Sequence, residues 1–122
     1  MTKIVTFKDL IAWQEGIKLV LLIYKITKQF PREELFALTT QMRRCAISVT
    51  SNIAEGFSRR NKKEKNQFYY IALGSVTELH NQLIISKELE YVSNENFLII
   101  ENSIILVHKL LNGLIKASQT YT

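Results

Sequence analysis

The chain has few of the residues that catalytic and metal-binding sites use. Its 122 residues include one Cys, one Asp and two His, and they contain no glycine-rich phosphate loop of either common type. A zinc site needs clustered Cys and His ligands, and a di-iron bundle needs Glu-x-x-His pairs on facing helices. Glu78 and His80 are two positions apart and Glu101 and His108 are seven apart, so neither pair fits. We therefore expect no metal and no cofactor, and we interpret both histidines as surface or boundary residues.

Turn-forming residues and cysteine are also scarce. One Pro and four Gly are too few for the many turns of a β-sandwich or barrel, and no segment alternates polar and apolar residues as a strand does. The single Cys45 has no partner for an internal disulfide, which favours a reducing compartment. The longest apolar run near the N-terminus, Leu19 to Tyr24, is far shorter than a membrane span. The sequence thus predicts a cytoplasmic helical protein that does not enter a membrane.

Helix start and stop signals divide the chain into four segments. Thr6 followed by Asp9, and Asn61 followed by Glu64, have the spacing of capping boxes, and Pro31 ends the first helix. Helices joined by short connections become antiparallel neighbours. The sequence therefore predicts a single all-α domain over residues 1–122, an antiparallel up-down four-helix bundle. Its helices are expected at about 8–29, 39–57, 62–90 and 94–118.

Apolar residues cover more of the first and last helices than one bundle core needs. The core-facing stripe of the last helix is predicted to be Phe97, Ile100, Ile104, Val107, Leu111, Leu114 and Ile115, widened by Ile99, Leu106 and Leu110. The corresponding stripe of the first helix is predicted to be Leu10, Trp13, Ile17, Val20, Leu21 and Tyr24, widened by Leu19, Ile23 and Phe30 and extended by Leu22 and Ile26. Leu35 and Phe36, in an irregular turn expected over residues 32–38, are predicted to be tucked inward. The excess apolar surface favours a homo-oligomer; the alternative is a wide core-facing arc with a few scattered exposed aliphatics.

The second predicted helix carries a polar stripe of short side chains. An ordinary solvated face is rich in Lys, Glu and Gln, whereas Ser and Asn are poor helix formers, so something is expected to pack close to this stripe. Glu55 and Glu78 are the carboxylates to consider as a catalytic acid or base. With no nucleophile or metal site beside them, we favour an inter-helix polar network in which Arg44 neutralises one of them. The predicted structural and interface network is Gln41, Arg44, Ser48, Asn52, Glu55 and Glu78.

Basic residues cluster around the turn between the second and third predicted helices. Long cationic side chains at a turn can reach phosphates, and Tyr69 and Tyr70 follow within two helical turns, where they could stack on bases. The candidate nucleic-acid-binding residues are Arg59, Arg60, Lys62, Lys63 and Lys65, with Arg43 as a further candidate and helix-1 lysines as an extension. The alternative is a solvated turn whose charge only keeps the protein soluble.

The ordered motifs of the chain resemble the small bacterial helical-bundle proteins related to those encoded by intervening sequences in 23S ribosomal RNA genes. The residues that carry this resemblance are Phe7-Lys-Asp-Leu10, Trp13-Gln14, Tyr24, Phe30-Pro31, Leu38, Gln41-Met-Arg-Arg44, Ser48, Asn52-Ile-Ala-Glu-Gly56, Arg59, Phe68, Ala72-Leu-Gly-Ser75 and Glu78-Leu79. The resemblance implies a homopentamer of four-helix bundles without established enzymatic activity. The chain is also similar to the accessory variability determinant of diversity-generating retroelements, a basic pentameric barrel that binds nucleic acid and partners a reverse transcriptase.

The sequence therefore predicts a non-enzymatic, oligomeric accessory factor that binds RNA or another nucleic acid with little sequence preference. The competing hypothesis is a protein-interaction scaffold that docks a partner such as a reverse transcriptase and has no direct nucleic-acid role. A hydrolase that uses Glu55 or Glu78 is a more distant third.

Overall fold

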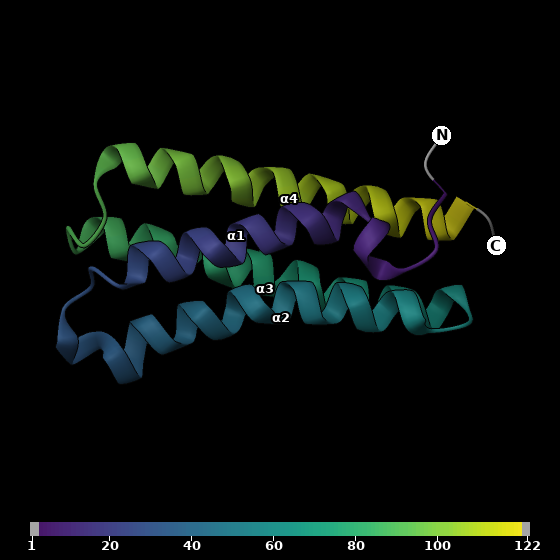
Figure 1. Cartoon of the computed structure of the whole chain (residues 1–122), viewed down its shortest axis with the longest axis horizontal. Coiled ribbons are helices and arrows are strands. Elements are labelled where there is room, and N and C mark those ends of the chain that lie inside the picture. The colour runs from purple at the N-terminus through teal and green to yellow at the C-terminus, as the bar shows by residue number, and fades with distance from the viewer. Residues whose placement is uncertain (1–2, 121–122) are drawn as a thin grey trace.

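The molecule consists of helices and their connections (Figure 1). The computed structural model describes residues 3–120, and the side chains of residues 3–117. Within this part of the chain there is no strand, so the prediction of an all-α fold with four helices is confirmed. The four helices are α1 (Ile11–Thr27), α2 (Thr40–Ser58), α3 (Lys62–Glu88) and α4 (Asn94–Thr120).

The four helices lie side by side, and the chain reverses direction at each connection (Figure 1). α2 packs against α1 and α3, while α4 packs against α3 and α1, which closes the arrangement into a bundle around one core. As a result, the start of α1, the α2–α3 connection and the end of α4 meet at one end of the bundle. The α1–α2 and α3–α4 connections lie at the opposite end.

The first helical turn is separate from α1. Thr6 and Asp9 form a capping box in which the Asp9 carboxylate accepts hydrogen bonds from the N–H groups of Val5 and Thr6 at 2.8 and 2.9 Å. This box caps a short 3₁₀ helix, Phe7–Asp9, and Leu10 is extended behind it. α1 therefore begins at Ile11, later than the capping signal alone suggests.

The buried side of α1 differs from the predicted stripe. Of the predicted stripe, Leu10 is buried, Trp13, Ile17, Val20 and Tyr24 are half-buried, and Leu21 is exposed. The residues predicted only to widen or extend it include four that are buried: Leu19, Ile23, Ile26 and Phe30. Small residues cause the difference, because they let α1 approach α2 closely: a Cβ added to Gly16 would lie 2.8 Å from Cγ2 of Thr50. The buried residues within α1 are Ala12, Gly16, Leu19, Ile23, Ile26 and Thr27.

The corner between α1 and α2 is irregular. A 3₁₀ turn, Arg32–Glu34, leads into a π-helical turn, Leu35–Thr39, which runs directly into α2. The prediction that Leu35 and Phe36 are tucked inward is wrong, because Leu35 is 44% exposed and Phe36 is 91% exposed. The wider π-helical turn directs both side chains away from the core, and Leu38 packs against the core instead.

α4 has an apolar inner side and an apolar outer side. The predicted inner stripe is buried at Phe97, Ile100, Ile104, Val107, Leu111 and Ile115, while Leu114 is half-buried. On the outer side Leu98, Ile99, Ile105 and Leu106 are between 41% and 55% exposed. We call these four residues the α4 face. By length and composition alone, Asn94–Ala117 is apolar enough to cross a membrane, a test that core helices of soluble bundles also pass.

Candidate nucleic-acid interface

The connection between α2 and α3 is three residues long. α2 ends at Ser58, and Arg59 is extended with φ −77° and ψ 153°. Asn61 caps α3, because its side-chain oxygen accepts a hydrogen bond from the N–H of Glu64 at 2.9 Å. This cap fixes the direction in which α3 leaves the turn, and it places residues 59–65 together at one end of the bundle.

Two of the predicted basic residues are held by the protein itself. Nη2 of Arg59 lies 3.1 Å from Oε2 of Glu55, and its guanidinium carbon is 4.7 Å from the centre of the Phe68 ring. Nζ of Lys65 donates a hydrogen bond to the carbonyl oxygen of Phe57 at 2.7 Å, and burial lowers the pKa of Lys65. Lys65 thus satisfies an otherwise open carbonyl at the end of α2, whereas Arg59 stays partly exposed in a fixed position.

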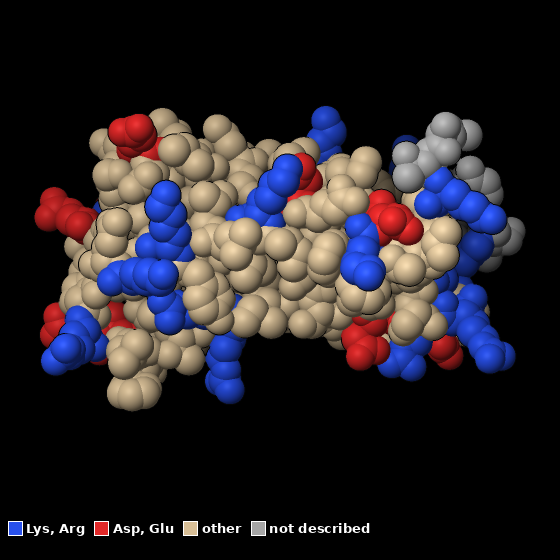
Figure 2. All heavy atoms as spheres, in the orientation of Figure 1, with Lys and Arg blue, Asp and Glu red and all other residues tan. Residues whose placement is uncertain are grey.

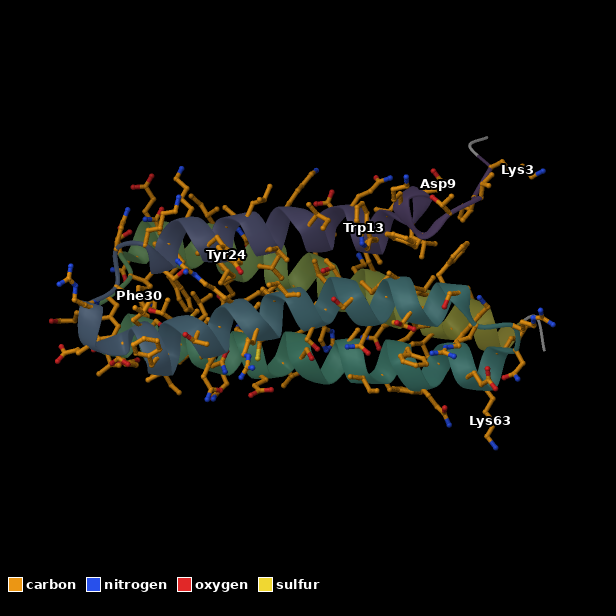
Figure 3. The ribbon with its side chains drawn as sticks, turned by 60° about the horizontal axis from the view of Figure 1, so that its bottom comes forward. Lys3, Asp9, Trp13, Tyr24, Phe30 and Lys63 are labelled. Carbon is orange, nitrogen blue, oxygen red and sulfur yellow. The ribbon has the colours of Figure 1, made fainter. Side chains whose placement is uncertain are left out.

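Other cations at this end are turned toward solvent. Arg60 and Lys63 are exposed and make no ion pair with any part of the chain between residues 3 and 120. Lys62 is half-buried and has contacts of its own. The 3₁₀ helix ahead of α1 lies at the same end, and Figure 3 shows Lys3 and Lys63 there. We define the basic end as Lys3, Lys8, Arg59, Arg60 and Lys63, all of which are exposed.

The carboxylates of the basic end are mostly engaged. Asp9 accepts the two capping hydrogen bonds, which hold the pKa of its carboxyl below the ordinary value. Glu55 is paired with Arg59, and Glu64 is exposed. Figure 2 shows several Lys and Arg side chains gathered at the right-hand end, where α1 begins and α2 ends. The sequence did not settle where the lysines near the start of helix 1 lie, and the capping box at Thr6 was the signal that could have placed them.

Arg43 lies far from the basic end. Its Nε donates a hydrogen bond to Oγ1 of Thr27 at 2.9 Å, and its guanidinium carbon is 4.6 Å from the centre of the Tyr24 ring. Tyr24 and Lys63 are near opposite ends of the bundle in Figure 3. Arg59 follows Arg43 by sixteen positions along α2, which corresponds to about 24 Å. Arg43 therefore joins α2 to α1 and does not extend the basic cluster.

The two adjacent tyrosines of α3 have different environments. Tyr69 is 2% exposed and packs against Gly56, where an added Cβ would lie 2.6 Å from its ring. Burial raises the pKa of Tyr69 to about 12. Tyr70 is 53% exposed. Of these two rings, only that of Tyr70 is therefore accessible to a ligand.

The predicted polar network lies along the seam between α2 and α3. The hydroxyl oxygens of Ser48 and Ser75 are 2.9 Å apart, which joins the two helices. Nδ2 of Asn52 donates to the carbonyl oxygen of Ser48 at 2.8 Å and to its hydroxyl at 3.1 Å. Burial and the neighbouring Glu78 carboxylate raise the pKa of the Cys45 thiol to about 11. Short side chains here let two helices of one chain approach closely.

The charged members of the network do not pair as the sequence suggested. Glu55 pairs with Arg59, one helical turn further along α2, and Arg44 forms no ion pair within residues 3–120. Gln41, Arg44 and Glu78 are exposed along the outer edge of the seam. The seam thus has a packed polar interior and an open charged edge.

The two histidines lie at one pocket between α3 and α4. Nε2 of His80 is 2.8 Å from Oε2 of Glu101, and Nδ1 of His108 is 3.2 Å from Nδ2 of Asn112. Both rings line an open pocket of about 340 Å³ together with Thr77 and aliphatic side chains. In the described part of the chain no three Cys, His, Asp or Glu side chains are grouped so as to hold a metal ion. Both histidines are half-buried, which agrees with their interpretation as boundary residues.

One protein-family model matches most of this chain. The family described as 23S rRNA-intervening sequence protein matches residues 8–113. The chain belongs to the 23S rRNA-intervening sequence protein family. No curated protein matches it. The family resemblance inferred from the sequence motifs is therefore confirmed.

A solved structure has the same fold as this member of the 23S rRNA-intervening sequence protein family. It is the crystal structure of a protein of unknown function from the S23 ribosomal protein family of Bacteroides thetaiotaomicron VPI-5482. The two chains are 24% identical, and the TM-score of 0.81 applies to 89% of this chain and 98% of the other. At this identity the likeness establishes the fold alone. The matched region includes α1, α2, α3 and most of α4, so the seam and the α2–α3 turn lie inside the family region.

Proposed function

We propose that this 23S rRNA-intervening sequence protein is a non-enzymatic, homo-oligomeric accessory factor that binds RNA or another nucleic acid through its basic end. The observation that carries the proposal is the group of five exposed cations at one end of the bundle. Phosphate contacts of this kind supply affinity without sequence information, so the expected binding is weak and has little sequence preference. Cytoplasmic localisation and the absence of a membrane partner belong to the same proposal.

The positions of the two candidate carboxylates support a non-enzymatic role. Glu55 is exposed and paired with Arg59, and Glu78 is exposed beside the Cys45 thiol. A general acid or base works best when its environment tunes its pKa and a reacting group can sit within hydrogen-bond reach. The thiol beside Glu78 has a raised pKa, and a protonated thiol is a poor nucleophile.

The α4 face supports assembly from copies of this chain. Leu98, Ile99, Ile105 and Leu106 are each about half exposed on one helix. Covering them would contribute about 1 kcal/mol each, or about 4 kcal/mol per subunit before other contacts. We propose the homopentamer that the family resemblance implies. A ring would present five basic ends to one strand, and linked weak sites bind far more tightly than a single one.

Salt-dependent binding tests the nucleic-acid role. Affinity for a fluorescent RNA of about 20 nucleotides is expected to fall steeply between about 50 and about 200 mM salt. The double variant Arg60→Glu and Lys63→Glu should lose most of this binding. The matched control, Lys25→Glu with Lys28→Glu, makes the same charge change at exposed positions near the other end of α1. Absence of binding by the wild-type protein at low salt would remove the proposal, and an equal loss in the control would reduce it to an effect of net charge.

One observation favours the alternative of a protein-interaction scaffold. Phe36 is 91% exposed beside Leu35, and an open pocket of about 310 Å³ next to it is lined by Ala37, Leu38 and Leu89 among others. Exposed aromatic side chains are enriched where proteins dock. If Phe36→Asp abolished binding to a partner such as a reverse transcriptase and RNA binding were absent, the scaffold role would replace the nucleic-acid role.

A further inference from the structure

We infer that the basic end selects single-stranded nucleic acid, and that Tyr70 stacks on an unpaired base while the neighbouring cations hold the phosphates of the same strand. This inference rests on the nucleic-acid role proposed above. It adds a class of ligand and a residue that distinguishes that class from a duplex.

Three side chains of α3 form one outward line that begins at the basic end. Lys63, Gln67 and Tyr70 are spaced four and three residues apart, so they share one side of the helix. All three are exposed. Lys63 and Tyr70 are about 10 Å apart along the helix axis, a distance that a strand of two to three nucleotides covers easily. Glu64, the carboxylate nearest in sequence, projects from the helix about 100° away from Lys63.

Among the described aromatic rings at this end, Tyr70 is the one with no ring contact to another described side chain. The Tyr69 ring is buried against Gly56, and the Phe68 ring is covered by the Arg59 guanidinium. Phe7 and Trp13 pack edge to face against each other with ring centres 5.3 Å apart. Within residues 3–120, Tyr70 makes no such ring contact, and it is 53% exposed. Its flat face is available for stacking.

A tyrosine ring on the protein surface can stack only on a base whose face is uncovered. In a duplex the faces of the bases are covered by their neighbours, and a tyrosine on the convex side of a helix cannot reach them. In a single strand a base can turn out of the stack and lie against the ring while its phosphates contact Lys63 and Arg60. The Gln67 amide lies between ring and cation, where it can donate to or accept from a base edge.

The test compares two probes on the full-length wild-type protein and three Tyr70 variants, with two further variants as controls. Fluorescence anisotropy at low salt measures binding of an oligoadenylate RNA of about 20 nucleotides and of an RNA duplex of the same length. Wild type is expected to favour the single strand. Tyr70→Ala should weaken single-strand binding about tenfold and leave duplex binding unchanged, because only the single strand stacks. Tyr70→Phe should bind like wild type, because it keeps the ring. Tyr70→Leu should behave like Tyr70→Ala, because it keeps apolar bulk without a flat face, and it serves if the alanine variant folds poorly.

Phe36→Ala is the matched aromatic control, since it removes an exposed ring at the opposite end and should change neither affinity. If the Tyr70 variants weakened both probes equally or neither, the inference would be overturned. The nucleic-acid role would still stand if both probes were lost in the Arg60 and Lys63 double variant. Failure of wild type to bind either probe would remove the nucleic-acid role and this inference together.

Discussion

The α1–α2 half and the α3–α4 half of the bundle contribute to the same core but present different outer surfaces. Residues 1–60 carry ten Lys and Arg against five Asp and Glu, whereas residues 61–122 carry six of each. Within residues 3–117 the first half exposes seven large apolar side chains, four of them outside α1 and α2, and the second half exposes nine, eight of them on α3 and α4. Core packing requires only that inward positions be apolar, so it does not explain this difference. The outer surfaces therefore differ in the partners they suit: the net positive charge of the first half suits a polyanion, and the helices of the second half offer more apolar surface to a second protein. The basic end joins the two halves, because Lys63 and Tyr70 lie on α3.

Replacing one exposed leucine of the α4 face by glutamate should have the largest effect, on the oligomeric state. Leu106→Glu places a charge in the α4 face, and we expect it to reduce the proposed homo-oligomer to monomers, because an unpaired carboxylate buried at a subunit interface costs several kcal/mol. Leu21→Glu is the control, since Leu21 is 64% exposed on α1, in the charged half. Light scattering coupled to size exclusion measures both. A wild-type monomer, or a Leu106→Glu protein of unchanged size, would contradict a role of the α4 face in assembly.

The seam that joins the halves should suppress the reactivity of its thiol. The pKa of Cys45 is raised to about 11 by burial and by Glu78, so at pH 8 its thiolate fraction is about 100-fold below that of an ordinary thiol. We expect alkylation of the native protein to be slower by at least this factor and to accelerate about tenfold per pH unit up to about pH 11. Because Cys45 is the single cysteine, the same reaction in denaturant is the control. Native labelling as fast as denatured labelling would show that the seam opens readily.

Two glycines, one in each half, should respond oppositely to alanine. Gly56→Ala would bring Cβ to 2.6 Å from the Tyr69 ring and 3.0 Å from the backbone oxygen of Lys65, and we expect a loss of about 2 kcal/mol in the free energy of unfolding. A Cβ added at Gly74 would meet no neighbouring atom within 4 Å. Helix propensity alone therefore predicts that Gly74→Ala raises the free energy of unfolding by up to about 1 kcal/mol. Urea unfolding of both variants measures the contrast. Similar stabilities would mean that the contact between Gly56 and Tyr69 relaxes without cost.

The hydroxyl pair across the seam should have the smallest effect. Ser75→Ala removes the hydrogen bond to Ser48, and we expect a loss of about 1 kcal/mol or slightly less, because alanine is the better helix former. Ser51→Ala, at an exposed position of α2, is the control and should be neutral or slightly stabilising. Thermal unfolding of the two variants is sufficient. If Ser75→Ala left the stability unchanged, close packing alone would account for the contribution of the seam to stability.

Predictions from the sequence were correct where a local pattern is compatible with one structure only. The cap at Asn61 and the inner stripe of α4 follow directly from spacing, and the short side chains at Ser48 and Asn52 correctly indicated a close approach of another surface. The sequence could not show whether that surface belonged to the same chain. Packing against α3 and packing against a second subunit would impose the same preference for small residues.

Other features depended on geometry that spacing does not encode. Lys65 and Lys63 are both basic and two residues apart, yet one donates to a carbonyl of α2 and the other faces solvent. Arg44 was expected to neutralise a carboxylate, but Arg59, one turn after Glu55, is better placed to do so. On α1 the close approach at Gly16 decided which side is buried, and that contact involves a residue 34 positions away.

The π-helical turn at Leu35–Thr39 has a consequence for how the chain tolerates insertions and deletions. Such a turn holds one residue more than the α-helix that follows it, so the register upstream of α2 is offset by about 100°. Deleting Ala37 would let α2 continue backward as a regular helix in which Phe36 directly precedes Leu38, and at 100° per residue Glu34, not Leu35 or Phe36, would then share the side of Leu38. The extra residue of this turn thus sets which side chains of the corner face the core, and a single codon lost there would exchange them.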